Sequence, residues 1–336
     1  MYKQFIRPFL FLIDPESVHN KMISILSGNR FYFPLMKALY EPPGSDTITV
    51  AGMEFRNRLG LAAGFDKNGV VLQFLDTIGF SHAEVGTVTP KPQPGNSKPR
   101  IFRLKKDSAI INRLGFNNQG VEAVKRNIAG SKVKLSTDFI VGVNIGKNKQ
   151  TEIANAVRDY KICFQELFEV ADYFTINISS PNTEGLRKLQ DREYLNELLE
   201  TICSLNDKMS AGPLKPVFVK IAPDLSEPEI ELIFETVIQN KINGIVATNT
   251  TISREGLMEE VNESGGLSGK PLFKKSSNVL KKLSELNSEN IISLIGVGGV
   301  FDKESFNQKV ESGASIVQIY TGLIYEGPGI IKKILT

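Results

Sequence analysis

The amino-acid sequence predicts an α/β protein, a closed (β/α)8 TIM barrel with a small N-terminal helical cap. Eight strand-like segments alternate with segments of helical period over about 280 residues, a length that suits such a barrel. No glycine fingerprint opens a nucleotide-binding half near the start, which disfavours an open doubly wound sheet. An apolar N-terminal stretch ends at the break EPPGS, residues 41–45, so we expect a cap over residues 1–40 and a barrel over residues 41–336.

The cap is expected to contain an amphipathic helix. Asp14 followed by Pro15 favours a helix start, because the carboxylate can accept hydrogen bonds from free N–H groups and proline fits the first position. Apolar residues then recur at helical spacing: Val18, Met22, Ile25 and Leu26. The preceding residues 1–13 mix large apolar side chains with Lys3 and Arg7. Two interpretations remain open, a helix packed on its own core and a cap whose apolar face enters a membrane surface.

The rest of the chain begins with a hairpin, expected over Ile48–Asn57, and continues as alternating strands and helices. The expected strands are Leu59–Ala63, His82–Val88, Phe139–Asn144, Tyr173–Ile178, Val217–Ile221, Gly244–Ala247, Ile291–Val297 and Ser315–Ile319. Polar segments of helical period separate them, among them Glu152–Val170, Arg192–Met209 and Glu227–Asn240.

Composition and charge narrow the function classes. The 40 basic and 37 acidic residues are mixed along the chain, so we expect no surface for nucleic acid. No apolar run approaches the roughly 18 residues of a membrane-spanning helix, and the charged, proline-containing N-terminus does not resemble a cleaved signal peptide. Cys163 and Cys203 are expected to be apolar fillers rather than a disulfide or metal pair. No histidine and carboxylate set at the strand ends has metal-ligand spacing, so we expect no metal centre.

A barrel of this kind carries its chemistry at the carboxyl ends of its strands. Those ends read, in order, AAGFDKN, GTVTPKPQPGN, NIGKNK, NISSPNT, KIAPD, TNTT, GVGG and YTG. An asparagine at the end of a buried strand costs free energy unless both ends of its amide find partners, so the repeated asparagines indicate one shared polar ligand. The last two loops are rich in glycine and lead into helices, which is where such barrels hold phosphate. Lys67 and Lys220 could form a Schiff base or stabilise negative charge on a bound ring.

The stretch TINISSPNTEGLR, residues 175–187, raises a chemical question. It carries two serines between asparagines, whereas the only histidines of the chain are His19 and His82, far away in the sequence. A serine that acts there as a base or nucleophile therefore has no nearby histidine to take its proton.

Together these motifs resemble those of the dihydroorotate dehydrogenases, and specifically of the membrane-associated class that reduces quinone. The resemblance covers essentially the whole chain, in the order DPESVHN, LGLAAGFDKNG, GTVTPKPQPGN, RIFRL, INRLGFNNQG, NIGKNK, NISSPNT, VKIAPDLS, ATNTT, GGLSGKPL, IGVGGV and VQIYTG. It implies an FMN-containing barrel that oxidises dihydroorotate to orotate in pyrimidine synthesis and passes two electrons to a membrane quinone.

The resemblance also implies the role of the serine. Ser180 occupies the position of the family's catalytic base, which removes a proton from the ring carbon beside a carbonyl while hydride leaves the neighbouring carbon for the flavin. Preorganisation and a water relay would then do the work of a histidine. In the soluble classes of the family this base resembles a cysteine, so Ser180 favours the quinone class.

The residues that bind the two ligands are implied in the same way. The substrate would be held by Lys67, Asn112, Arg113, Leu114, Gly115, Phe116, Asn177, Asn182, Asn249 and Thr250. FMN would be held by Ala63, Gly64, Phe65, Asp66, Lys67, Thr87, Asn144, Asn177, Lys220, Thr248, Gly269, Gly299, Tyr320 and Thr321. Lys220 would lie beside the flavin edge that becomes anionic on reduction, and the last three residues near the phosphate.

In the family the cap forms a hydrophobic tunnel toward the flavin, and His19, Arg103 and Tyr320 match residues near the quinone head group. The structural alternatives are an arginine that only pairs with a carboxylate and a histidine satisfied within its helix. We expect a peripheral monomer on the cytoplasmic side of a bacterial inner membrane, because the N-terminus lacks the Arg- and Ser-rich segment of mitochondrial import. Phe65 stands where a leucine is commoner, which leaves the tunnel's width open.

Two other functions fit parts of the sequence. A fumarate-linked or NAD-linked dihydroorotate dehydrogenase would keep the oxidation and change the acceptor, although a cysteine in place of Ser180 and no helical extension would then be expected. A lyase or aldolase would use Lys220 as a Schiff base, which borohydride would trap on that lysine.

Overall fold

The computed structural model describes residues 2–28, 30–44, 47–183 and 185–336, and its centre is a closed barrel of eight parallel strands. The strands are β3 (Leu59–Leu61), β4 (His82–Val88), β7 (Ile140–Ile145), β8 (Tyr173–Asn177), β9 (Val217–Ile221), β10 (Gly244–Ala247), β12 (Ser293–Val297) and β13 (Ile316–Ile319). Around the barrel they follow the order β10, β12, β13, β3, β4, β7, β8 and β9, and β9 pairs with β10. The predicted barrel and its predicted strands are confirmed, with ends that differ by at most about two residues.

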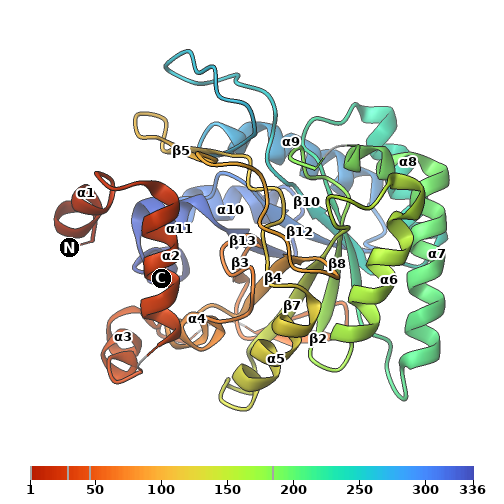
Figure 1. The fold of residues 1–336 in the computed structure, drawn as a ribbon, viewed down its shortest axis with the longest axis horizontal. Coiled ribbons are helices and arrows are strands. Elements are labelled where there is room, and N and C mark those ends of the chain that lie inside the picture. The colour runs from red at the N-terminus through yellow and green to blue at the C-terminus, as the bar shows by residue number, and fades with distance from the viewer. Residues whose placement is uncertain (1, 29, 45–46, 184) are drawn as a thin grey trace.

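Helices surround the barrel, as Figure 1 shows. They are α4 (Leu72–Thr77), α5 (Val121–Lys132), α6 (Ala156–Leu167), α7 (Arg192–Met209), α8 (Glu227–Gln239), α9 (Leu272–Leu286), α10 (Lys303–Glu311), α11 (Thr321–Glu326) and α12 (Ile330–Leu335). Helix α7 has its predicted bounds, and α8 begins after Ser226, which forms a reciprocal capping box with Glu229. The segment predicted as one helix over Glu152–Val170 starts instead with the 3-10 turn η2 (Ile153–Asn155), where no side chain caps the free N–H groups.

The amino-terminal end of the barrel is plugged by side chains. The predicted hairpin forms as β1 (Ile48–Val50) and β2 (Met53–Phe55), which pair antiparallel. Phe55 meets the ring of His82 edge to face, with 5.1 Å between the ring centroids, and both side chains are buried. Because this end is closed, a cavity for a ligand is expected only at the carboxyl-terminal end of the strands.

Two loops of the barrel pair with each other in a way that the sequence did not predict. Strands β5 (Ile101–Leu104) and β6 (Ala109–Asn112) form a hairpin in the loop after β4, and β11 (Gly266–Gly269) comes from the loop after β10. They make an antiparallel sheet in the order β11, β6, β5, in which Asn112 lies opposite Gly266. Each strand is only four residues long and its partner can lie 154 residues away, so the local pattern gives no signal.

The N-terminal helices lie on one side of the barrel, in red in Figure 1, near the C-terminus of the chain. They are η1 (Tyr2–Ile6), α1 (Arg7–Leu10), α2 (Pro15–Ser27) and α3 (Phe33–Tyr40). The predicted start of α2 is confirmed, because the Asp14 carboxylate accepts a hydrogen bond from the Ser17 N–H at 2.8 Å. The predicted apolar stripe is wrong at Ile25, which is 48% exposed, whereas Ile23 and Leu26 pack on the barrel core. The inward face of α2 is set by its contacts with β5 and α4.

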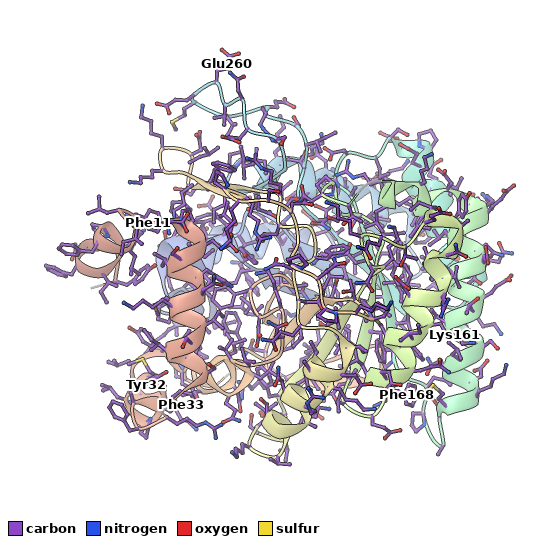
Figure 2. The ribbon with its side chains drawn as sticks, viewed as in Figure 1. Phe11, Tyr32, Phe33, Lys161, Phe168 and Glu260 are labelled. Carbon is purple, nitrogen blue, oxygen red and sulfur yellow. The ribbon has the colours of Figure 1, made fainter. Side chains whose placement is uncertain are left out.

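A buried ion pair and aromatic packing hold the cap to the barrel. The two carboxylate oxygens of Glu16 accept hydrogen bonds from the Arg100 guanidinium at 2.7 and 3.0 Å. Phe11, labelled in Figure 2 at the junction of α1 and α2, packs edge to face on Tyr325 with 5.2 Å between ring centroids. These contacts fix the position of the cap against strands and helices of the barrel.

The domain boundary expected after residue 40 follows the last residue of α3, and it stays a prediction. The EPPGS break that suggested it ends at Ser45, which lies outside the described residues. Within the described part of the chain, no helix has both the length and the apolar character needed to cross a bilayer. Cys163 and Cys203 are free, as expected from their apolar surroundings.

Candidate active site

A cavity opens at the carboxyl-terminal ends of the barrel strands, opposite the plugged end. Its empty space, including open solvent at the mouth, is about 1000 Å³. The predicted site residues that line it are Ala63, Gly64, Lys67, Thr87, Asn112, Leu114, Gly115, Phe116, Asn177, Ser180, Asn182, Lys220, Thr248, Asn249, Thr250, Gly269, Gly299, Tyr320 and Thr321. The barrel thus brings together strand-end motifs that are far apart in the sequence.

Some predicted site residues do not line this cavity: Phe65, Asp66, Asn144 and Arg113. The Asp66 carboxylate accepts hydrogen bonds from the N–H groups of Val70 and Val71 at 3.0 and 2.8 Å, so it shapes the turn before α4. The Arg113 side chain donates to Glu263 at 2.6 Å, whereas its neighbours Asn112 and Leu114 line the cavity. A direct ligand contact by either side chain stays a prediction.

Three predicted flavin-binding residues form one hydrogen-bond network at the bottom of the cavity. The Asn177 amide donates to Thr87 Oγ1 at 2.9 Å and to Asn144 Oδ1 at 3.0 Å. The Thr87 hydroxyl donates to the same Asn144 oxygen at 2.5 Å. Asn144 is fully buried, so it acts by orienting the two side chains that reach the cavity.

Beneath this network lies a buried ion pair that was not predicted from the sequence. Glu84 Oε1 lies 3.5 Å from Lys220 Nζ, and the Glu84 carboxylate also accepts from Asn144, Thr175 and Gln318 at 2.8, 3.0 and 3.1 Å. Burial raises the pKa of Glu84, but the charge of Lys220 and these hydrogen bonds outweigh burial, so the pKa lies below its ordinary value. A lone acidic residue within the apolar strand HAEVGTV was the available signal.

Lys67 presents the second cation of the cavity wall. Burial lowers its pKa to about 8, against the opposing charges of Glu16 and Asp66, which raise it. The ammonium form therefore prevails near neutral pH, although it is easier to deprotonate than an ordinary lysine. Such a group favours an anionic ligand such as a carboxylate.

Ser180 lies in the loop after β8 and is only 5% exposed. Its Oγ accepts a hydrogen bond from the Asn182 N–H at 3.2 Å, and the Asn182 amide reaches Asn112 Oδ1 at 3.4 Å. The Asn249 amide donates to Ser179 Oγ at 3.0 Å. The loops after β4, β8 and β10 therefore converge on the position of Ser180.

Neither histidine lines this cavity. His82 is buried at the plugged end, where its Nδ1 lies 2.8 Å from Ser81 Oγ, and burial lowers its pKa to about 3. His19 lies on α2, and burial together with the charge of Lys67 lowers its pKa to about 3. Both rings are neutral near pH 7, and within the described residues neither is a hydrogen-bond partner of Ser180.

The far end of the cavity is formed by the glycine-rich loop after β12. Gly299 has a φ of +82°, and a Cβ there would lie 2.4 Å from the Cβ of Phe273, so only glycine allows this close approach to α9. Two buried acceptors on the cavity wall, Gln318 Oε1 and Asn117 Oδ1, have no hydrogen-bond partner within the described residues. Buried acceptors of this kind are normally satisfied, so they fit a ligand that offers N–H groups, as flavin and pyrimidine rings do.

An aromatic path joins the cap to the cavity. The His19 ring lies 5.4 Å from that of Phe65, and Phe65 lies 6.1 Å from Tyr320, which lines the cavity. Arg103 takes a different position, where its guanidinium donates to the carbonyl of Leu10 at the end of α1 at 3.2 Å and to that of Ile13 at 3.0 Å. The structure thus brings His19 and Tyr320 onto one path and uses Arg103 to hold the cap.

Comparison with known proteins gives a consistent match. The family model described as dihydroorotate dehydrogenase matches residues 46–336. A dihydroorotate dehydrogenase (quinone) from Christiangramia forsetii is 48% identical, with 99% of this chain and 97% of the relative covered, and one from Coxiella burnetii is 46% identical, with 100% and 96% covered. The crystal structure of DHODH from Eimeria tenella in complex with ferulenol is similar with a TM-score of 0.87 and 36% identity, covering 96% of this chain and 89% of that one.

Proposed function

The chain belongs to the dihydroorotate dehydrogenase family, and from this premise we propose how its residues, with bound FMN, carry out the family's reaction. The chain oxidises dihydroorotate to orotate, a step of pyrimidine biosynthesis, with a quinone as the electron acceptor. The observation that carries the proposed mechanism is the convergence of Ser180, Lys67 and several asparagine amides on one cavity. When bound, FMN supplies the acceptor that takes hydride from the substrate and gives up the electrons to the quinone.

The cavity wall fits FMN in charge and in hydrogen-bonding capacity. The loops after β12 and β13 offer a glycine-rich site for the phosphate, where Gly299, Tyr320 and Thr321 line the wall. Lys220 contributes a positive charge that Glu84 holds in place from below. The unsatisfied Gln318 oxygen supports a ligand with an N–H group.

Ser180 is the proposed base. Its Oγ takes the proton from the ring carbon beside the carbonyl while its own proton passes to water. The serine hydroxyl is therefore neutral again after the step. The Asn182 N–H donates to this oxygen at 3.2 Å and favours its more negative form. A hydroxyl is a weak base in water, and its use depends on this fixed, largely water-free position.

Substrate binding is assigned to charged and amide groups around the base. Lys67 pairs with the substrate carboxylate, and the amides of Asn112, Asn182 and Asn249 read the ring carbonyl and N–H groups. An amide offers both a donor and an acceptor, which matches the alternating pattern of a pyrimidine ring. These residues orient the ring so that the reacting carbon faces Ser180.

The N-terminal cap is proposed to lie on a membrane surface and to admit the quinone. Its exposed apolar side chains include Phe5, Phe9 and Leu12, with exposures of 65%, 69% and 80%. The His19, Phe65 and Tyr320 rings offer an apolar route from the cap to the cavity. We place the protein, as a monomer, on the cytoplasmic face of a bacterial inner membrane.

The function is tested by following the flavin through its two half-reactions. The purified protein is mixed anaerobically with dihydroorotate, and the loss of yellow flavin absorbance is recorded. The reduced protein is then mixed with a ubiquinone analogue, fumarate or NAD. We expect rapid reduction by dihydroorotate and rapid reoxidation by the quinone analogue alone.

Other results would refute parts of the proposal. Protein without flavin absorbance, or flavin that dihydroorotate does not reduce, contradicts the proposed use of FMN. Reoxidation by fumarate or NAD in preference to quinone would assign the chain to a soluble class. Borohydride trapping of substrate on Lys220 would indicate Schiff-base chemistry instead.

A further inference from the structure

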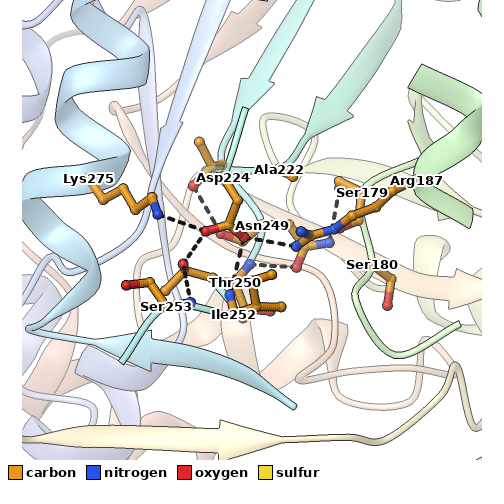
Figure 3. A network of polar contacts seen from close by, with 12 residues as sticks. Ser179, Ser180, Arg187, Ala222, Asp224, Asn249, Thr250, Ile252, Ser253 and Lys275 are labelled. Carbon is orange, nitrogen blue, oxygen red and sulfur yellow. Dashed lines mark hydrogen bonds and ion pairs between the residues drawn. The ribbon is translucent and has the colours of Figure 1, made fainter. Parts of the chain in front are cut away.

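One carboxylate outside the cavity joins two loops of the proposed site. Asp224, in the loop after β9, accepts from Arg187 Nη2 at 3.0 Å and from the Ile252 N–H at 3.1 Å through Oδ2. Its Oδ1 accepts from the Thr251 hydroxyl and lies 2.9 Å from Lys275 Nζ. Figure 3 shows Asp224 at the centre of this network, between Lys275 on α9 and Arg187.

Arg187 connects the carboxylate to the Ser180 loop. It lies in the short 3-10 helix η3 (Leu186–Gln190), and its Nε donates to the carbonyl of Ser179 at 3.3 Å. Ser179 directly precedes Ser180 in the chain, and Figure 3 shows the two side by side at the edge of the network. Any movement of Arg187 therefore acts on the backbone that carries the Ser180 hydroxyl.

The second arm of the network reaches the loop after β10, whose Asn249 amide is proposed to bind the substrate. Thr251 and Ile252, both bound to Asp224, directly follow Asn249 and Thr250, which line the cavity. The Asn249 amide in turn donates to Ser179 Oγ at 3.0 Å, which closes the ring between the two loops. The loop after β8, which carries Ser180, and the loop after β10, which carries Asn249, are thus held in one relative position.

Asp224 is partly buried and ionised, and both properties strengthen its hydrogen bonds. The Asp224 side chain is 11% exposed, and the hydrogen bonds from Thr251, Lys275 and Ile252 outweigh burial, so that the pKa of Asp224 lies below its ordinary value. Ionised hydrogen-bond partners make the stronger bonds. By contrast, Arg192 and Glu235 form a pair at 2.6 Å whose side chains are 51% and 62% exposed, on the outer surface of α7 and α8.

We propose that Arg187 and Asp224 form a clamp that positions the Ser180 hydroxyl against the substrate. The inference rests on the proposed function, in which Ser180 is the base. Neither residue lines the cavity, so both are positioning residues that act through Ser179 and the β10 loop. Because a misplacement of about 1 Å can cost about 100-fold in rate, loss of the clamp slows proton removal without removing any substrate contact.

The test is the rate of flavin reduction by dihydroorotate in a single anaerobic turnover. Arg187→Met removes both donors, and we expect a rate lower by about tenfold to a hundredfold with unchanged orotate affinity and flavin content. Arg187→Lys keeps a charge near Asp224 and is expected to recover part of the rate. Arg192→Met, the matched control on the outer surface, leaves the rate as in the unaltered protein.

A second measurement separates positioning from general damage. In the Ser180→Ala background the hydroxyl is absent, so Arg187→Met should cause little further loss of rate. Asp224→Asn keeps the shape of the side chain and should slow flavin reduction as Arg187→Met does. It provides a second variant if the Arg187→Met protein binds no flavin.

Four results would overturn the clamp. If dihydroorotate reduces the flavin of Arg187→Met at the unaltered rate and that of Ser180→Ala slowly, the clamp is refuted and the proposed function stands. An equal loss in the presence and absence of the Ser180 hydroxyl means that Arg187 is only structural. An unaltered protein that dihydroorotate does not reduce, or a Ser180→Ala variant that is fully active, removes the proposed function and the clamp with it.

Discussion

In the barrel, apolar side chains such as Leu59, Val143 and Ile176 are completely buried, whereas in the cap Phe9 and Phe31 are 69% and 79% exposed. Among the described residues 2–28 and 30–40, the one buried side chain is charged, Glu16. The cap therefore exposes large apolar side chains, although Ile23 and Leu26 pack on the barrel, and it buries the Glu16 carboxylate. A surface of this kind is costly in water and favourable at a membrane, which supports a lipid partner for the cap alone.

With the function proposed above, this contrast divides the two half-reactions between two regions. The cavity, Ser180 and the asparagine amides belong to the barrel, so we expect oxidation of dihydroorotate to need no membrane. The exposed apolar face and the His19 side of the aromatic path belong to the cap, so we expect delivery of a lipid-soluble quinone to depend on the cap at a membrane surface. Changes in one region should therefore alter one half-reaction and spare the other.

The largest effect is expected for Ser180→Ala. Loss of a general base typically lowers a rate by about 10²-fold to 10⁴-fold, so flavin reduction by dihydroorotate should fall by that factor in stopped-flow measurements. Orotate affinity and reoxidation by a quinone analogue should not change, because neither uses the base. A variant whose reoxidation also collapses would show that the two half-reactions are not separated as proposed.

Glu16→Gln tests how firmly the cap is fixed to the barrel. The Glu16 and Arg100 side chains are 8% and 7% exposed, and removal of one partner of a buried pair typically costs about 3 to 5 kcal/mol. We expect a loss of that order in the free energy of unfolding measured by denaturant titration. Glu41→Gln breaks the exposed pair with Lys37, whose side chains are 41% and 59% exposed, and should have no measurable effect.

The same pair predicts how the cap responds to acid. The hydrogen bond from Arg100 is the main reason that the pKa of Glu16 lies below its ordinary value of 4.5. A carboxyl group with a lowered pKa stabilises the folded state fully above the ordinary value, and this contribution is lost as the pH falls through the folded value. In Glu16→Gln the dependence of stability on pH below about 4.5 should be weaker; an unchanged dependence would mean that other carboxylates dominate.

Phe5→Asp combined with Phe9→Asp tests the outward face of the cap. Burial of a phenylalanine contributes about 2 kcal/mol, so loss of two partly inserted rings should weaken binding to lipid vesicles by at least about tenfold. Turnover with a membrane quinone should fall, whereas turnover with a water-soluble oxidant should not. The control is Val133→Asp with Leu214→Asp, because these residues are 80% and 54% exposed on the barrel. Equal losses in both double variants would remove the distinction between the two surfaces.

The sequence predicted the barrel well because its strands have strong local signals. A parallel strand buried on both faces is a continuous apolar run, as in Gly244–Ala247, and the polar residues that follow it mark the cavity. The start of α2 was equally local, since Asp14 and Ser17 are three residues apart. These features depend on neighbouring residues and need no knowledge of the fold.

What the sequence did not predict depends on distant pairing. Strand β11 pairs with β6 because the barrel places their loops side by side, and Asp224 is hydrogen-bonded to Arg187, 37 residues away in the sequence. The inward face of α2 was misjudged at Ile25 for the same reason, because the contacts with β5 and α4 decide which side is buried. The family resemblance suggested the roles of Ser180 and the ligand-binding residues, whereas the pairing of Glu84 with Lys220 was found only in the structure.

The smallest expected effect joins the two regions instead of separating them. Burial lowers the pKa of Lys67 to about 8, and the strongest opposing influence is the charge of Glu16, which belongs to the cap. The carboxylate of orotate binds better to the protonated lysine, so the dissociation constant should be steady below pH 8 and rise by up to about tenfold per pH unit above it. Flavin absorbance changes on orotate titration measure this.

Two variants isolate that dependence. In Lys67→Met the rise above pH 8 should vanish, and any change that remains belongs to orotate itself. In Glu16→Gln the loss of the negative charge lowers the pKa of Lys67 further, so the rise should begin at a lower pH. If Glu16→Gln leaves the onset where it was, the cap contributes no charge to the substrate site and only its apolar surface and its route for quinone distinguish it from the barrel.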